Sequence, residues 1–230
     1  MDGFDFWGPY VPPERTRATR MFAARSKSSA RGFLLAKLHR SAAWRQFIFE
    51  SNEERKCLLV SFSQREVVDI WDQPPRVPFR DAAGKLRYHV FDYLLLFETG
   101  FKLALAVKPS ALVERNGFDK ELALIKAQLP KRFADDALLV TENSYSEAEV
   151  RNAELLHMFR GIEDAEADAV VAEVLRGLNG STSVQQVVEA TGLKGRAYRA
   201  VFRAIFDGAV EADLSHHVTE RSMLTLPEVQ

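Results

Sequence analysis

The stretch LRYHVFDYLLLFETGFKLALAVKPS, residues 86–110, contains two apolar runs separated by a short turn signal that ends in glycine. Two extended runs joined in this way predict an antiparallel β-hairpin. Side chains alternate between the two faces of a strand, so Leu105 and Val107 share one face while Ala106 and Lys108 share the other. The second strand is therefore expected to end on a lysine that points away from its most apolar face.

Asp92 interrupts the first apolar run, as Lys108 ends the second. Because the turn makes the two strands antiparallel neighbours, these side chains are expected to meet at one end of the hairpin. Their spacing alone favours a salt bridge at the strand edge, without chemistry. The chemical alternative is a metal site, since an aspartate, a lysine and a helical glutamate are the groups that metal-assisted phosphodiester hydrolysis uses.

The flanking sequence predicts helices and strands around this hairpin. Ser51 and Glu54 have the spacing of a helix N-terminal cap, and they precede apolar residues at 57–62. Further strands are predicted at 67–71 and 136–142, and further helices at 121–129 and 146–160. A meander of strands followed by alternating helix and strand predicts an α/β domain with a mixed central sheet.

The carboxy-terminal part of the chain is expected to form a second domain. The acidic segment 161–168 has few large apolar residues and is predicted to be the linker. Residues 169–230 then give three short helices and a hairpin, which is the arrangement of a winged helix. On the third helix Arg196, Arg199 and Arg203 lie three and four residues apart, as in a recognition helix that presents cations to double-stranded DNA. Docking to another protein is the alternative use of such a domain.

The charge of the chain is unevenly distributed. The net charge is −1 over 230 residues, yet residues 15–46 carry nine basic side chains and no acid. We expect residues 1–45 to be a basic amino-terminal arm that contacts a polyanion, or else a solvated leader. Acids near the start are unlike a signal peptide, and no apolar run approaches the ~18 residues of a membrane span, so a cytoplasmic protein without membrane contact is expected. Cys57, the single cysteine, excludes an internal disulfide.

Four motifs resemble those of the TnsA family of transposon endonucleases, which are restriction-endonuclease-like nucleases. These motifs are ESNEE (50–54), VVDIWDQPPRVPF (67–79), RYHVFDYLLLF (87–97) and LALAVKPS (103–110). The similarity runs over residues 45–157, and a carboxy-terminal winged helix is also found in the family. It implies an α/β restriction-endonuclease-like domain over residues 46–160, with a mixed central sheet.

The resemblance also assigns site residues. Carried over position by position, it makes Glu54 the helical glutamate, Asp92 the metal-binding aspartate and Lys108 the catalytic lysine. Mg²⁺ or Mn²⁺ would then be bound by Asp92 and Glu54. Gln73, with the proline that follows it, matches a structural pair on the strand before the hairpin.

Two positions depart from the family pattern. Phe91 stands where a proline usually precedes the aspartate, and Ala106 replaces the acid or amide expected two residues before the lysine. Alanine offers no metal ligand. Either Glu98 or Glu121 supplies the ligand, or a main-chain carbonyl and water complete the metal shell, or the domain has lost catalysis.

The leading expectation is a divalent-metal DNA endonuclease that hydrolyses phosphodiester bonds in transposition or a related mobile-element process. The resemblance implies double-stranded DNA as substrate and a transposase and an ATPase regulator as partners, and a homodimer would let two sites address two strands. The alternative is a catalytically impaired DNA-binding or assembly subunit, marked by Ala106. A winged-helix regulator with a sensor domain is a third hypothesis, although no feature of the sequence points to a small-molecule pocket.

Overall fold

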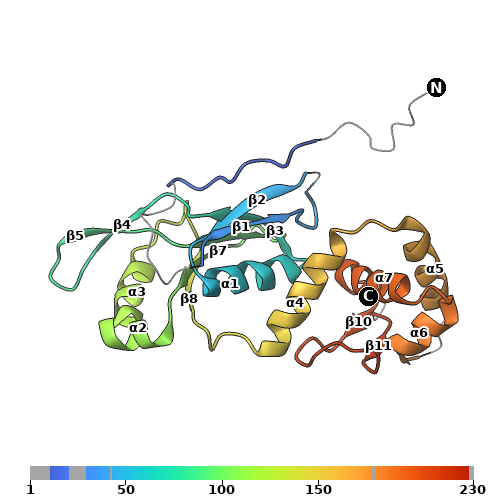
Figure 1. Ribbon diagram of the computed structural model, residues 1–230. Helices are drawn as coiled ribbons and strands as arrows, with labels where there is room; N and C mark the ends of the chain where they lie inside the picture. The colour runs from blue at the N-terminus through green and yellow to red at the C-terminus, as the bar shows by residue number, and fades with distance from the viewer. Residues whose placement is uncertain (1–10, 21–29, 42, 178–179, 228–230) are drawn as a thin grey trace.

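The computed structural model describes residues 11–20, 30–41, 43–177 and 180–227, and it has a four-stranded mixed sheet at the centre of an α/β architecture (Figure 1). The sheet order is β3 (Val67–Asp72), β6 (Tyr93–Phe97), β7 (Lys102–Val107) and β8 (Asp136–Val140). The first three strands are antiparallel neighbours, and β8 is parallel to β7. The predicted α/β class and mixed sheet are confirmed.

Each face of this sheet has its own apolar cluster. One face packs against α1 (Asn52–Ser63) and a hairpin of β1 (Gly32–Ala36) and β2 (Arg45–Phe49), and Leu105 belongs to this cluster. The other face packs against α2 (Ser110–Asn116) and α3 (Phe118–Ala127), and Ala106 belongs to that cluster. The period-two alternation predicted for β7 is therefore present, but both of its faces are buried.

The apolar run over residues 86–97 is divided between two sheets. Its first part is β5 (Leu86–His89), which pairs with β4 (Val77–Arg80) in a separate two-stranded sheet. Its second part is β6, and residues 90–92 between the two parts are not in a strand. Asp92 therefore lies at a bend, and the expectation of a single strand through Asp92 was wrong.

The described part of the expected basic arm packs onto this domain. The β1–β2 hairpin crosses residue 45, where the arm was expected to end. Upstream of it, the Glu14 backbone N–H donates to the Trp44 carbonyl, and the Glu14 carbonyl accepts from the Gln46 N–H. Residues 1–10 and 21–29 of the arm lie outside the described residues.

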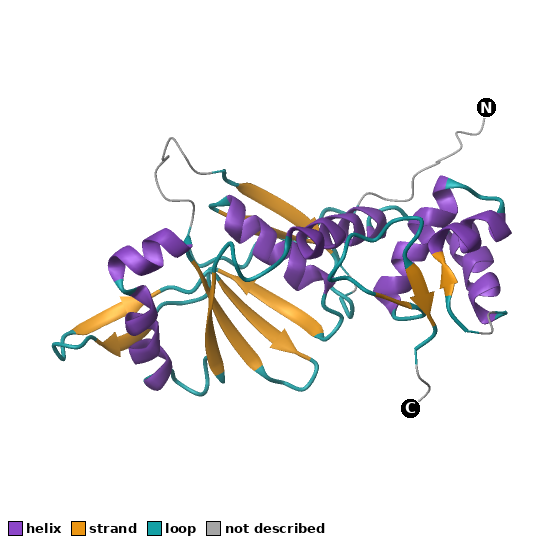
Figure 2. Cartoon of the chain, turned by 90° about the horizontal axis from the view of Figure 1, so that it is seen from below, coloured by secondary structure: helices purple, strands orange, loops and turns teal. Residues whose placement is uncertain are grey.

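The carboxy-terminal helices and a small sheet gather at the end of the molecule opposite the β4–β5 hairpin (Figures 1 and 2). The helices are α5 (Ala165–Arg176), α6 (Val184–Thr191) and α7 (Gly195–Asp207). The strands are β9 (Thr182–Ser183), β10 (Glu211–Ala212) and β11 (Met223–Thr225), in the order β10–β11–β9. These agree with the predicted three helices and hairpin, and β9 is an additional strand.

The acidic segment 161–168 is not a linker over its whole length. Asp164 caps α5, which begins at Ala165, so the second half of the segment is the first turn of this helix. Acidic residues are stabilising there because the N-terminus of a helix carries a partial positive charge. The acidic composition predicted a linker, whereas the acids of residues 164–168 belong to a helix start.

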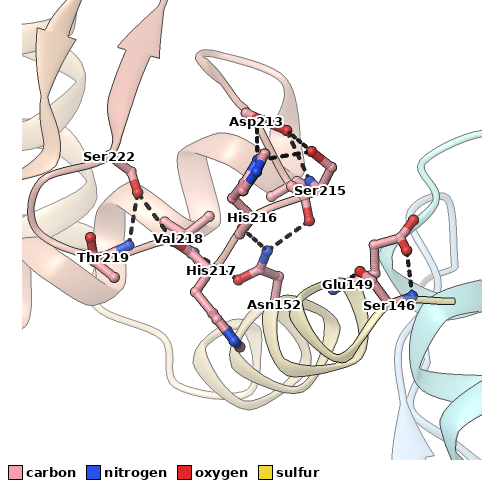
Figure 3. Close-up of polar contacts among 11 residues, drawn as sticks. Ser146, Glu149, Asn152, Asp213, Ser215, His216, His217, Val218, Thr219 and Ser222 are labelled. Carbon is pink, nitrogen blue, oxygen red and sulfur yellow. Dashed lines mark hydrogen bonds and ion pairs between the residues drawn. The ribbon is translucent and has the colours of Figure 1, made fainter.

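Helix α4 (Glu147–Arg160) joins the two parts of the molecule. It packs against α1 at one side and α7 at the other. The Arg160 guanidinium lies 3.3 Å from the ring centroid of Phe206 and donates to the carbonyls of Phe62 and Lys37. Asn152 is buried and binds three backbone groups of the loop that follows β10 (Figure 3).

No helix in the described ranges is long and apolar enough to cross a membrane.

Candidate active site

The bend before β6 holds Asp92 against the end of β7. The Asp92 backbone N–H donates to the Leu105 carbonyl, and its own carbonyl accepts from the Gln73 N–H. Its carboxylate Oδ2 accepts from the Val107 backbone N–H at 2.7 Å. The side chain is also buried. The backbone of Asp92 is thus held by residues of both neighbouring strands, and its carboxylate is held by β7. The bend thus points a buried carboxylate at the end of β7, where Lys108 follows.

Glu54 reaches the same place from the first turn of α1. Ser51 caps this helix by accepting from the Glu54 N–H, as the sequence predicted. The Glu54 carboxylate accepts from the Glu50 backbone N–H at 2.7 Å and from the Ser51 hydroxyl at 3.1 Å. Tyr93, which directly follows Asp92, donates its hydroxyl to the Glu54 carbonyl. The helix start therefore fixes a second buried carboxylate beside the first.

Burial and neighbouring charge disfavour the ionised forms of both carboxylates. Burial, the largest cause, and the negative charge of Asp92 together raise the pKa of Glu54 from 4.5 to about 7, against the hydrogen bonds from the Glu50 N–H and Ser51, which lower it. Burial also raises the pKa of Asp92, while Lys108 and the Val107 hydrogen bond act to lower it. Two buried acids with raised pKa values in one place are typical of a site that receives a cation or handles protons.

Lys108 lies directly after β7, and its backbone N–H donates to the Val140 carbonyl. Its Nζ lies 5.5 Å from the ring centroid of Phe118. Its charge acts on Asp92, and together with burial it lowers the pKa of His89 to about 4. The structure thus brings together Glu54, Asp92 and Lys108, the three residues that the sequence assigned to catalysis.

Sequence reasoning missed Arg20, which approaches this site from the amino-terminal segment. Its guanidinium donates to Glu50 Oε2 at 3.0 Å and to Gln73 Oε1 at 2.9 Å, and its charge lowers the pKa of Asp92. The excess of basic residues in this segment was the only signal, and it did not single out one arginine. Glu50 was missed as well, although it belongs to the quoted motif ESNEE.

Gln73 supports the site as a structural residue, in line with its expected role. It is 1% exposed and has φ of 44°, a left-handed conformation that a residue other than glycine seldom adopts. Its backbone N–H donates to the Asp92 carbonyl, and its own carbonyl accepts from Thr19. The strained turn at Gln73 therefore connects the bend at Asp92 to the amino-terminal segment.

Neither glutamate named as a replacement ligand lies in this cluster of contacts. Glu98 follows the far end of β6 from Asp92, which places it on the order of 15 Å or more along the strand, and it pairs with Arg40. Glu121 is exposed on α3. Ala106 is fully buried among apolar residues. The shell of a metal here would need water or main-chain oxygen beside the two acids.

The residues present fit Mg²⁺ or Mn²⁺ in a sparse site. Within the described residues there is no group of three or more His, Cys, Asp or Glu side chains arranged for a metal. Mg²⁺, however, keeps several waters and commonly uses only one or two protein carboxylates. Burial raises the pKa of both Glu54 and Asp92, so a bound cation would stabilise their ionised forms. These two residues would hold the ion.

Two of the three arginines of α7, Arg196 and Arg203, bind acids at the start of α5. Arg196 forms ion pairs with Asp164 and Glu166, at 2.8 and 2.7 Å. Arg203 is buried and donates to Asp168 and to the carbonyl oxygens of Phe159 and Ile162. The expectation that it faces a DNA duplex was therefore wrong.

Arg199 has an intermediate exposure, and contact between this residue and DNA stays a prediction. The acids that pair with Arg196 and Arg203 lie at the start of α5, within residues 161–168, which were expected to be a linker.

No model of a known protein family and no curated protein matches the chain in sequence comparisons.

The pKa of Glu54 gives the metal-free protein a testable pH dependence. Its folded value of about 7 lies above the ordinary 4.5, so its contribution to stability is complete below 4.5 and is lost as pH rises through 7. Glu54→Gln cannot ionise. We subtract the free energy of unfolding of the native protein from that of Glu54→Gln. This difference should increase by about 2 to 3 kcal/mol from about pH 5 to about pH 8.

Urea unfolding in the presence of a chelator measures this difference at each pH. Other titrating groups, including His89 and His157 with pKa values lowered to about 4, affect both proteins and cancel in the difference. A difference that does not change with pH would mean that Glu54 is ionised normally in the folded protein.

Proposed function

We propose that the chain is a metal-dependent DNA endonuclease of the TnsA type, acting on phosphodiester bonds of double-stranded DNA. The observation that carries the proposal is the convergence of Glu54 and Asp92, two buried acids, with Lys108 at the end of β7. A restriction-endonuclease-like fold is part of the proposal. The mixed sheet with helices on both faces is compatible with it.

Each residue has a role in the proposed hydrolysis. A bound Mg²⁺ would polarise the scissile phosphate and lower the pKa of an attached water. Asp92 would hold the ion, and Glu54 would bind the ion or position the attacking water. The Lys108 ammonium stabilises the negative charge that grows on the phosphate in the transition state.

We further propose that residues 169–230 are a winged helix that assists DNA binding or assembly. The chain order α5, β9, α6, α7, β10, β11, with β11 between the other two strands, supports this assignment. The partial burial of the α7 arginines favours assembly over direct reading of a duplex by α7. A transposase and an ATPase regulator are the proposed partners, a homodimer is the proposed assembly, and the cytoplasm is the proposed location.

The test is cleavage of supercoiled plasmid in the presence of Mg²⁺ or Mn²⁺, followed by gel electrophoresis. We expect nicking that a chelator abolishes. Lys108→Ala should slow nicking about 100-fold and keep DNA affinity within about twofold, because the lysine acts on the transition state. Lys102→Ala, at the other end of the same strand, is the matched control and should cleave normally.

A catalytically impaired binding subunit is the second candidate, and Ala106 is the observation that favours it. In that case the native protein binds DNA without cutting it, and Ala106→Glu gains activity. Because Ala106 is completely buried, a thermal melt must first show that this variant folds. Absence of cleavage by the native protein with both metals would reject the leading proposal in favour of this one.

A further inference from the structure

The β4–β5 hairpin is a ribbon that projects from the end of the molecule opposite the carboxy-terminal helices (Figures 1 and 2). Its register pairs Pro78 with Tyr88 and Arg80 with Leu86. Pro78, Arg80, Leu86 and Tyr88 are all exposed and share one face by alternation, with Leu86 50% and Tyr88 53% exposed. This face of the ribbon has no covering element within the described ranges.

The opposite face anchors the ribbon to the body of the protein. Val77 and Phe79 are buried in the apolar cluster beneath the sheet. The side chain of Gln128 accepts from the Arg80 backbone N–H at 2.9 Å and donates to the Arg80 carbonyl at 3.0 Å. The ribbon is therefore held along the whole of β4, and its outer face is presented in a defined orientation.

The ribbon is strongly basic. Arg76, Arg80, Lys85 and Arg87 are exposed, and Asp81 is the one acid between residues 76 and 89. The Asp81 carboxylate is engaged in building the turn, since it accepts from the backbone N–H groups of Ala83 and Lys85 and pairs with Arg87. The Arg76 guanidinium stacks on the Tyr88 ring, 4.4 Å from its centroid. Basic side chains around an exposed aromatic ring favour the binding of a polyanion that also has flat apolar groups.

The two strands also begin and end at the candidate active site. β4 starts four residues after Gln73, and β5 ends three residues before Asp92. The base of the ribbon is therefore connected by short segments to Gln73 and Asp92. A two-stranded ribbon has the dimensions of the DNA major groove, and basic side chains along it neutralise the flanking phosphates.

We propose that the β4–β5 ribbon is a DNA-gripping arm that lies in a groove of the duplex and places the adjacent phosphates at the active site. The inference rests on the proposed nuclease function for its choice of DNA as the ligand. It adds a surface that would hold the DNA on the nuclease domain itself. Stacking of Arg76 on Tyr88 keeps the outer face ordered before DNA arrives.

The test measures binding of the full-length protein to a fluorescent duplex of unrelated sequence, by anisotropy in chelator-containing buffer at several salt concentrations. The variant is Lys85→Glu, at the exposed ribbon turn, where the backbone hydrogen bond to Asp81 does not depend on the side chain. We expect the Kd to increase about tenfold and the salt dependence of log Kd to fall by about one unit. Arg76→Ala, which removes the stack on Tyr88, should weaken binding several-fold.

The matched control is Arg151→Glu, an equal charge reversal on the exposed surface of α4. It should change the Kd less than twofold. Equal losses in Lys85→Glu and Arg151→Glu, unchanged binding in Lys85→Glu, or no binding by the native protein would each overturn the inference. Plasmid cleavage reports separately on the proposed function. A native protein that cuts while its Lys85→Glu variant binds normally keeps the nuclease and loses the ribbon, and the reverse pattern keeps the ribbon and loses the nuclease.

Discussion

Replacing Asp92 with asparagine is expected to lower the rate of plasmid nicking at least about 10³-fold, equivalent to about 4 kcal/mol of lost transition-state stabilisation. Asparagine has nearly the same shape, and its carbonyl oxygen can still accept from the Val107 backbone N–H. The bend before β6 is therefore retained. The substitution removes the negative charge of one of the two acids that are proposed to hold the divalent metal.

Three measurements on Asp92→Asn separate catalysis from folding. The variant should bind duplex DNA with a Kd within about twofold of the native value, and its thermal stability should not decrease. The pKa of Glu54 should fall below about 7, because the variant lacks the negative charge of Asp92, which repels the ionised Glu54 carboxylate. Residual nicking within tenfold of the native rate would contradict the assignment of Asp92 as a metal ligand.

Asn152→Leu is expected to have the largest effect on stability, a loss of about 3 to 5 kcal/mol in the free energy of unfolding. Asn152 is 1% exposed on α4. Its amide nitrogen donates to the carbonyls of Leu214 and His216, at 2.9 and 2.7 Å, and its amide oxygen accepts from the Val218 N–H (Figure 3). Leucine fills similar space but leaves these three backbone groups without a partner.

Urea unfolding measures the loss, and hydrogen exchange at Val218 locates it. The Val218 amide should lose protection in Asn152→Leu, because its acceptor is removed. His216→Ala is the control in the same loop. Its ion pair with Asp213 is exposed, so its removal should change stability by less than about 1 kcal/mol. A loss below about 1 kcal/mol in Asn152→Leu would show that water replaces the missing hydrogen bonds.

Much of the local structure could be predicted because it depends on neighbouring residues. The cap at Ser51 and the capping box of Ser146 with Glu149 are set by short spacings, and both are present. The turns before β5 and β7 follow from glycine signals at Gly84 and Gly100, which have positive φ. The three short carboxy-terminal helices and their hairpin were equally visible from periodicity.

The candidate site could be predicted in part. The polar interruptions at Asp92 and Lys108 located it at one end of a hairpin, and the resemblance supplied Glu54. Arg20 and Glu50 were not found, because they are 30 residues apart in the sequence and no local spacing predicts a contact at that separation. The bend at Asp92 was also missed, since an apolar run does not reveal that its two halves pair with different partners.

The sequence by itself determined most of the helices and several strands, because caps, turns and alternation act over a few residues. It did not determine the strands β1, β2 and β9 or the break between β5 and β6. It did determine that one acid and one lysine, Asp92 and Lys108, interrupt the apolar pattern of the central hairpin. Tertiary structure alone decided what each charge does. Arg203 is neutralised by α5, Arg20 is brought to Glu50, and the arginines of the β4–β5 ribbon are left facing outward. Charges act through space, and only the packing of distant segments sets those distances.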